Sequence, residues 1–181
     1  MKIGVLALQG DFFEHQQILE GLSVQTKQVR KANELSDLDG IIIPGGESTT
    51  IGKLAVDFGL LEPLREFASE KAVWGTCAGT IFLAKNTHNQ QPLLGLMNIT
   101  VERNAFDRQV DSFEVDLDVP ALASITLPNP PFRAIFIRAP LIESVGENVE
   151  VLAQLPDGRI VAARQKRWLA TSFHPELSGD D

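Results

Sequence analysis

One cysteine lies in a sequence context typical of a catalytic nucleophile. Cys77 is the single cysteine of the chain, and it is the central residue of Gly75-Thr-Cys-Ala-Gly79. This stretch matches the nucleophile-elbow pattern G-x-S-x-G with cysteine replacing serine, a sharp turn between a strand and a helix. In such a turn the amide of the next residue, Ala78, points toward a developing oxyanion. A lone cysteine is ordinarily a buried small hydrophobe, but the elbow favours a nucleophile.

A nucleophilic cysteine needs groups that stabilise its thiolate. A free thiol has a pKa of about 8.5, which a helix N-terminus and a neighbouring histidine lower. The elbow provides the helix, and His174-Pro-Glu176 follows a strand-like run near the end of the sequence. Side chains two residues apart on an extended chain point to the same side. We therefore predict that Glu176 orients His174, and that His174 activates Cys77.

A second glycine loop, Gly45-Gly-Glu-Ser48, also follows a strand-like run. In a doubly wound sheet it borders the same crevice as the elbow, where its backbone amides bind a carboxylate or an oxyanion. An ordinary glycine turn with Ser48 as a helix cap fits these residues equally well. Proximity to Cys77 decides between the two interpretations. His15 and His88 have no comparable setting, so we expect both on the surface or in helices.

The elements that position these motifs alternate along the first half of the chain. Compact apolar runs that stop at glycines are typical of buried strands, and apolar residues at helical spacing predict helices. The predicted strands cover residues 2–8, 24–29, 39–44 and 72–75, and the predicted helices cover 12–22, 48–58, 60–70 and 78–85. This alternation predicts a three-layer α/β fold, in which helices cover both faces of a doubly wound, mainly parallel sheet.

The second half of the chain is different in character. Strand-like runs occur at residues 99–103, 112–117, 134–138, 149–155, 160–164 and 168–173, with few helices between them. No long polar linker divides the halves, which favours an antiparallel extension of the same sheet. We therefore expect residues 1–181 to form a single domain.

Composition narrows the class of protein further. The chain has 181 residues, of which 44% are hydrophobic, enough for one substantial core. A formal charge of -8 disfavours nucleic-acid binding. The apolar start is too short for a signal peptide, and no apolar run is long enough to cross a membrane. Because one cysteine forms no internal disulfide, nothing indicates an oxidising compartment, and we expect a cytoplasmic protein.

Several motifs together resemble those of one family. They are Pro-Gly-Gly-Glu-Ser-Thr-Thr50, Gly-Thr-Cys-Ala-Gly79, Arg-Asn-Ala-Phe106, Arg-Gln-Val-Asp-Ser-Phe113, Phe-Ile-Arg-Ala-Pro140 and Ser-Phe-His-Pro-Glu-Leu177. The chain resembles the glutaminase subunit of pyridoxal 5'-phosphate synthase from its first strand through Leu177. The combination is more specific than the triad that class I glutamine amidotransferases share. The resemblance implies their flavodoxin-like glutaminase domain.

The resemblance also assigns roles to residues. It implies that Cys77 is the nucleophile and that His174 and Glu176 complete the relay. The residues that it implies for glutamine binding are Gly46, Glu47, Ser48, Arg103, Ile137 and Arg138. By themselves, the two arginines would be interpreted as solvated charges at strand ends.

These assignments predict a two-step hydrolysis of glutamine. The Cys77 thiolate attacks the side-chain amide, while the Ala78 amide and the Gly45-Gly46 loop stabilise the oxyanion. His174 protonates the departing ammonia and then activates water against the thioester. This half-reaction needs no metal or organic cofactor. The resemblance implies that ammonia passes to a separate synthase subunit, in a large hetero-oligomer, which builds pyridoxal 5'-phosphate from a pentose phosphate and a triose phosphate.

Two other functions are consistent with parts of the sequence. Elbow and triad alone also fit an independent cysteine hydrolase, such as a peptidase or a gamma-glutamyl hydrolase. A catalytically idle regulatory subunit is supported by two departures from the family pattern. Asp107 replaces the usual glycine, and the chain stops at Ser178-Gly-Asp-Asp181, where the family continues into a helix. Release of ammonia from free glutamine distinguishes glutaminase from both.

Overall fold

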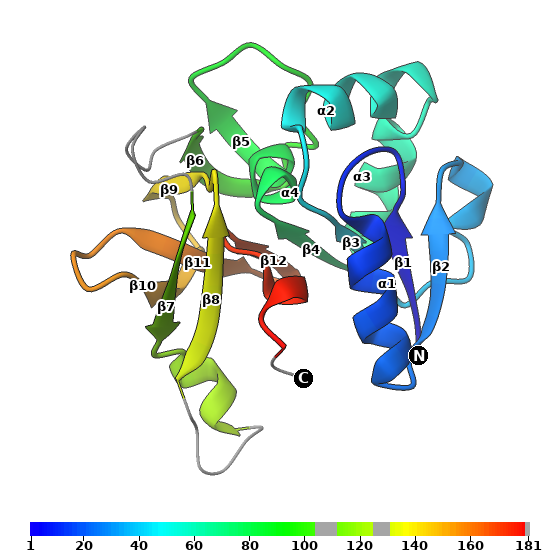
Figure 1. Cartoon of the computed structure of the whole chain (residues 1–181). Coiled ribbons are helices and arrows are strands. Elements are labelled where there is room, and N and C mark those ends of the chain that lie inside the picture. The colour runs from blue at the N-terminus through cyan, green and yellow to red at the C-terminus, as the bar shows by residue number, and fades with distance from the viewer. Residues whose placement is uncertain (104–111, 125–130, 180–181) are drawn as a thin grey trace.

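The computed structural model describes residues 1–103, 112–124 and 131–179 (Figure 1). Its parallel strands are β1 (Lys2–Leu6), β2 (Gln25–Val29), β3 (Gly40–Ile43), β4 (Ala72–Thr76) and β12 (Trp168–Thr171). They lie side by side in the order β2-β1-β3-β4-β12. This is the flavodoxin-like order, in which ligands bind at the carboxyl ends of the strands. The predicted doubly wound sheet is confirmed.

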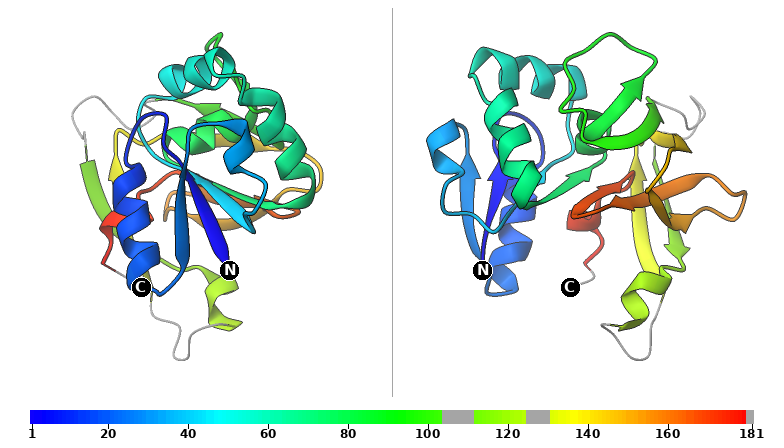
Figure 2. Two further views of the ribbon diagram at one scale, coloured as in Figure 1. Left: turned by 90° about the vertical axis from the view of Figure 1, so that its right-hand side faces the viewer. Right: turned by 180° about the vertical axis from the view of Figure 1, so that it is seen from behind.

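Helices cover both faces of these strands. They are α1 (Phe12–Gly21), α2 (Ser48–Asp57), α3 (Leu61–Glu70) and α4 (Ala78–Leu83). Helix α1 contacts β1 and β2, whereas α2 contacts α3 and α4. Figure 2 shows α1 on one side of the parallel strands and α3 on the other, as the predicted three layers require. Among the described residues, no helix is long and apolar enough to cross a membrane.

The sheet continues beyond β12 with strands of the second half. These are β5 (Ala84–Thr87), β6 (Met97–Glu102), β9 (Leu141–Val145), β10 (Glu150–Gln154) and β11 (Ile160–Gln165). β11 pairs antiparallel with β12, the order continues through β9, β6 and β5, and β10 also pairs with β11. The antiparallel extension of the same sheet is therefore confirmed.

Three details differ from the expectation. Strands β7 (Ser112–Leu117) and β8 (Phe132–Ile137) form a separate two-stranded sheet. Strand β9 was not predicted, because Glu143 and Ser144 interrupt its apolar pattern. The helix predicted for 78–85 ends at Leu83, where the Phe82 and Leu83 carbonyls accept from the amides of Leu94 and Leu96. Those hydrogen bonds give the last carbonyls of the helix partners outside it, so the helix ends there and β5 begins.

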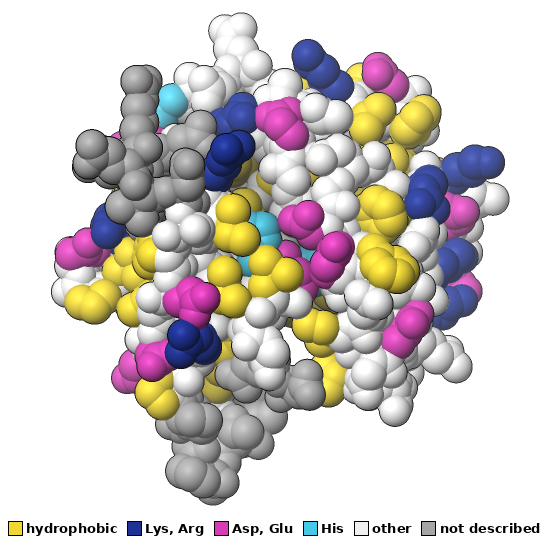
Figure 3. Space-filling model, in the orientation of Figure 1, with side chains coloured by type: hydrophobic (Ala, Val, Ile, Leu, Met, Phe, Trp, Pro, Cys, Tyr) yellow, Lys and Arg dark blue, Asp and Glu magenta, His cyan; other side chains and the backbone are white. Residues whose placement is uncertain are grey.

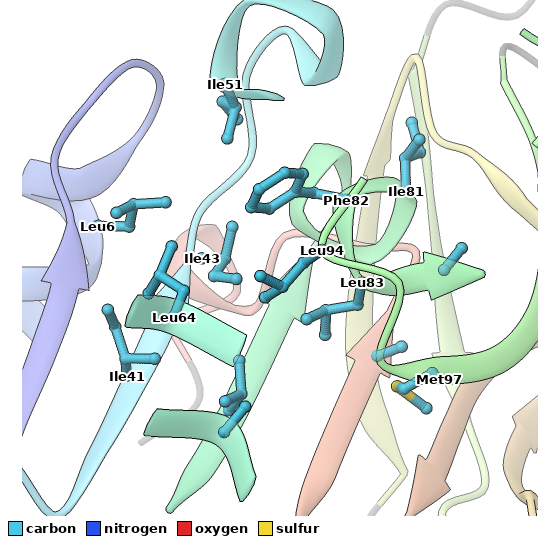
Figure 4. Packing of buried hydrophobic residues seen from close by; sticks show 14 of the residues in the cluster. Leu6, Ile41, Ile43, Ile51, Leu64, Ile81, Phe82, Leu83, Leu94 and Met97 are labelled. Carbon is cyan, nitrogen blue, oxygen red and sulfur yellow. The ribbon is translucent and has the colours of Figure 1, made fainter. Parts of the chain in front are cut away.

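Within the part of the chain that the structure describes, two hydrophobic clusters hold the layers together. The larger one, shown in Figure 4, joins the sheet to α2, α3 and α4 through fully buried side chains such as Ile43, Leu64 and Phe82. The smaller one joins the β7–β8 pair to β10, β11 and the segment after β12. Its Phe136 and Phe173 rings meet edge to face at 5.7 Å. This contact anchors the residue that precedes His174.

Candidate active site

The elbow predicted around Cys77 is present between β4 and α4. Cys77 has φ 48° and ψ -106°, a backbone conformation that non-glycine residues adopt only at a cost. Its amide donates to the Thr171 carbonyl at 2.8 Å. The Thr80 hydroxyl contacts the same carbonyl at 2.7 Å and that of Gly75 at 2.9 Å. Hydrogen bonds to β4 and β12 thus hold the strained turn in place.

Glycine is required after the nucleophile because two backbones meet there. A Cβ atom at Gly79 would overlap the carbonyl oxygen of Ile43 at the end of β3. Helix α4 can therefore start directly above the sheet, with Cys77 at its N-cap position. The start of α4 is buried throughout, so the elbow is rigid where the nucleophile is attached.

The structure brings the three predicted triad residues together. His174 and Glu176 are 5% and 7% exposed, and Nδ1 of His174 lies 2.6 Å from Oε1 of Glu176. Cys77 is close enough to the same imidazole to raise its pKa. The short helix η3 (Pro175–Leu177) turns the chain so that Glu176 faces back to the histidine. Figure 3 shows histidine atoms reaching the surface among acidic and hydrophobic side chains near the centre of this face.

Electrostatics favours the protonated form of His174. Burial alone would lower the pKa of His174, but hydrogen bonds with Cys77 and Glu176, and their negative charges, raise it to about 10. An imidazolium next to the sulfur is the partner that a thiolate requires. The arrangement is suited to nucleophilic attack by Cys77 and to proton donation by His174.

The Gly45-Gly46 loop lies beside the triad, as expected if it borders the same crevice as the elbow. A Cβ added to Gly45 would lie 2.6 Å from Cε1 of His174. The Gly45 carbonyl accepts from the Asp11 amide at 3.2 Å. Ser48 does not cap α2; Glu47 occupies that position and accepts from the Thr50 amide at 2.7 Å. The alternative with Ser48 as the cap is therefore wrong.

Arg103 follows β6 and points at the start of α2. Its guanidinium lies 2.7 Å from Oε1 of Glu47, 2.9 Å from Oγ1 of Thr49 and 3.1 Å from Oε1 of Gln91. Burial alone would raise the pKa of Glu47, but hydrogen bonds from Thr50, Thr49 and Arg103 lower it to about 2. Arg103 is thus a partner of Glu47 and not an isolated solvated charge. Gln91, which also contacts Ser48, carried no sequence signal.

The predicted residues at the end of β8 lie on the other side of the nucleophile. Sγ of Cys77 lies 3.9 Å from the Ile137 carbonyl oxygen, and the Ile137 side chain is 39% exposed. Arg138 has a positive φ of 45°, which turns the chain sharply after the strand. The motif residues 104–111, with Asp107 among them, lie outside the described residues. The glutamine-binding and oxyanion roles of all these residues stay predictions.

His15 is a site residue that the sequence did not indicate. We expected His15 on the surface or in a helix. It lies in helix α1, but it is buried, with 4% of its surface exposed. Its Nε2 lies 3.1 Å from Oγ1 of Thr76 and 3.3 Å from Oε2 of Glu176. The contact between His15 and Glu176 joins the first helix to the end of the chain, so the spacing of residues in the sequence does not predict it. His88 is exposed and pairs with Glu143 at 2.6 Å, as expected.

Asp11 is a further acidic group beside the triad. Its Oδ2 lies 3.7 Å from Nδ1 of His174, and burial raises the pKa of this carboxyl. Within the described residues, Asp11, His174 and Glu176 could together hold a metal ion. Nδ1 of His174 is already hydrogen bonded to Glu176, so the donor set fits a proton relay better than a metal centre.

Comparison with known proteins assigns the chain to a family. The model of the SNO glutamine amidotransferase family matches residues 5–181. A protein of Herpetosiphon aurantiacus named pyridoxal 5'-phosphate synthase subunit PdxT is 60% identical, with 99% of this chain and 95% of that protein covered. A protein of Carboxydothermus hydrogenoformans with the same name is 57% identical, with coverages of 99% and 92%.

Solved structures agree with this assignment. A crystal structure of a glutamine amidotransferase has a TM-score of 0.91 at 49% identity, covering 98% of this chain and 92% of the other. The structure of PurLQS from Thermotoga maritima has a TM-score of 0.72 at 17% identity, covering 97% and 87%; that likeness concerns the fold alone. With its elbow, its buried Cys-His-Glu constellation and these matches, the chain belongs to the SNO glutamine amidotransferase family.

Proposed function

We propose that this chain hydrolyses L-glutamine to L-glutamate and ammonia, and that a separate pyridoxal 5'-phosphate synthase subunit consumes the ammonia. The observation that carries the proposal is the relay of Cys77, His174 and Glu176, with its 2.6 Å contact between imidazole and carboxylate. The family and the full-length relatives named as synthase subunits support the same activity.

The steps follow from the protonation of the relay. The Cys77 thiolate attacks the side-chain carbonyl carbon of glutamine, forming a carbon–sulfur bond and an oxyanion. His174 gives its proton to the amide nitrogen as the carbon–nitrogen bond breaks, and ammonia leaves. Neutral His174 then takes a proton from water, which attacks the thioester and releases glutamate. Glu176 keeps the imidazole oriented and stabilises its positive charge throughout.

Backbone amides are proposed to stabilise the oxyanion. Ala78 begins α4 directly after the nucleophile, so its amide belongs to the unsatisfied N-terminal turn of that helix. Gly45 lies beside His174, and Gly46 packs against Gln9 and Gly10. Gly46 has a φ of 142°, a conformation natural to glycine, and the amide of Glu47 that follows it donates to Oε1 of Gln9 at 2.6 Å.

Glutamine is proposed to bind between the start of α2 and the end of β8. The backbone of Gly46, Glu47 and Ser48 and the side chain of Arg103 recognise its polar end, and a guanidinium is well suited to a carboxylate. Ile137 and Arg138 are proposed to line the opposite wall. In this structure Arg103 is bonded to Glu47, so binding of the substrate carboxylate requires Arg103 to share or exchange that contact.

The partner is proposed to be a synthase subunit in a large hetero-oligomer, as the names of the relatives suggest. A free subunit that hydrolysed glutamine without an acceptor would waste it. We therefore propose that docking selects the loop orientation in which the oxyanion hole is complete. We further propose that residues 1–181 act as one glutamine amidotransferase domain. The cytoplasmic location stays a prediction from the sequence.

Glutamate and ammonia release tests the proposal directly. The chain should release both from glutamine when a synthase subunit is added, and the rate should rise as that subunit is titrated in. A gamma-glutamyl peptide should be a poor substrate, which distinguishes glutaminase from a gamma-glutamyl hydrolase or peptidase. Absence of glutamate formation in a complex confirmed by sedimentation would refute the glutaminase assignment, whereas equal rates with and without partner would refute only activation by docking.

A further inference from the structure

His15 is a buried histidine to which the proposed reaction gives no part. It lies in the first half of α1 and reaches under the elbow, where its Nε2 lies 3.3 Å from Oε2 of Glu176 and 3.1 Å from Oγ1 of Thr76. The Trp74 ring borders it edge to face at 6.4 Å. His15 therefore touches the carboxylate oxygen that faces away from His174.

The two oxygens of Glu176 have unequal surroundings. Oε1 is bonded to Nδ1 of His174 at 2.6 Å. Oε2 is fully buried, and in the part of the chain that the structure describes no hydrogen bond of good geometry reaches it. A buried carboxylate oxygen without a donor is costly. Nε2 of His15 lies 3.3 Å from this oxygen, within reach of a hydrogen bond that it would share with Oγ1 of Thr76 at 3.1 Å.

The protonation of His15 follows from its neighbours. Burial lowers the pKa of His15 in spite of the attraction of Glu176, so the ring is neutral and carries one N–H. If Nε2 lacked the proton, its lone pair would face the carboxylate at 3.3 Å, which is repulsive. The proton therefore belongs on Nε2. The other charged or titratable groups that act on His15 are His174, Asp11 and Glu14.

We propose that His15 is a positioning residue, whose Nε2–H donates to Oε2 of Glu176 and holds that carboxylate in place for His174. The inference rests on the proposed function and deepens it, extending the relay to His15, Glu176, His174 and Cys77. A neutral donor orients Glu176 without cancelling its charge. Glu176 therefore keeps its full effect on the imidazolium.

Substitution of His15 in the full chain, assayed with the synthase subunit, tests this role. His15→Leu removes the donor, and loss of one buried hydrogen bond corresponds to a change of about 5-fold to 150-fold. We expect kcat for glutamate formation to fall within that range while KM for glutamine changes less than about twofold. The alkaline limb of the pH profile, where His174 loses its proton, should move to lower pH. His15→Gln, which presents an N–H at similar reach, should recover most of the rate.

Two controls separate positioning from a general structural role. His88→Leu removes an exposed histidine far from the relay and should leave kcat unchanged. In a Glu176→Gln background the further substitution His15→Leu should cost less than about twofold, because both act through one carboxylate. If His15→Leu does not fold, His15→Asn takes its place, since asparagine is too short to reach Glu176.

The outcomes are distinguishable. An unchanged kcat and pH profile in a folded His15→Leu variant would overturn the inference. So would an equal loss in the Glu176→Gln background, or a His15→Gln variant as slow as His15→Leu. A wild-type complex that forms no glutamate counts against the proposed glutaminase activity and not against the contact of His15 with Glu176.

Discussion

Thr80 lies directly under the nucleophile, and Thr80→Val tests whether its hydroxyl holds the elbow in its strained conformation. The hydroxyl is fully buried and contacts the carbonyls of Gly75 at 2.9 Å and Thr171 at 2.7 Å. Valine keeps the volume and the branching at Cβ, so the change removes mainly the donor. A hydroxyl has one proton to donate, so the change removes one hydrogen bond that is shared between the two carbonyls. The Thr171 carbonyl keeps the Cys77 amide at 2.8 Å.

The expected cost follows from removing one donor from buried acceptors. Removing one partner of a buried hydrogen bond costs roughly 1 to 3 kcal/mol. In a chain of this size, each kcal/mol lowers Tm by about 2 to 4 °C. We therefore expect Thr80→Val to lower Tm by roughly 2 to 12 °C. Glutaminase kcat should also fall, because the Cys77 backbone is free to relax from its positive φ.

Thr87 provides a matched control for the same chemical change. Its Oγ1 is buried and, within the described residues, has no hydrogen-bond partner. Thr87→Val should therefore change the free energy of unfolding by less than about 0.5 kcal/mol, or stabilise the protein. Urea unfolding and calorimetry measure both variants, and glutamate formation measures kcat. If Thr80→Val proves no more destabilising than Thr87→Val, the hydroxyl does not hold the elbow.

Further predictions concern the relay and the binding loop. Cys77→Ala should abolish glutamate formation while circular dichroism shows a native fold; wild-type activity would exclude Cys77 as the nucleophile. Arg103→Ala should weaken glutamine binding by roughly 1.5 to 3 kcal/mol, measured by calorimetry, with Arg133→Ala, which removes an exposed pair with Glu114, as the unaffected control. The pKa of His174 is raised from 6.5 to about 10, so protonated His174 stabilises the folded state. This contribution to the free energy of unfolding is complete below pH 6.5 and is lost as the pH rises through 10. The Tm advantage of wild type over His174→Gln should shrink over that window, and a pH-independent difference would contradict the raised pKa.

The sequence determined the local geometry of the relay. The elbow is a local pattern, because the strand, the glycines and the helix that form it are consecutive in the chain. His174 and Glu176 are two residues apart, so an extended segment and a short turn suffice to join them. The parallel strands were equally predictable, since burial on both faces leaves continuous apolar runs such as Ile41–Ile43. These features depend on backbone conformation and burial, and both can be predicted from the types of neighbouring residues.

Tertiary structure alone decided the contacts between distant segments. The pairing of Arg103 with Glu47 and Gln91, and of His15 with Glu176, depends on the order of the strands and on the packing of α1 against η3. Strands β7 and β8 likewise form a sheet of their own, which packs on β10 and β11 through the cluster around Phe136 and Phe173. Residue types show that a side chain is polar or apolar, but its partner is set by which elements the folded chain brings together. Hydrophobic burial, which has no direction of its own, leaves that choice to the packing of the whole domain.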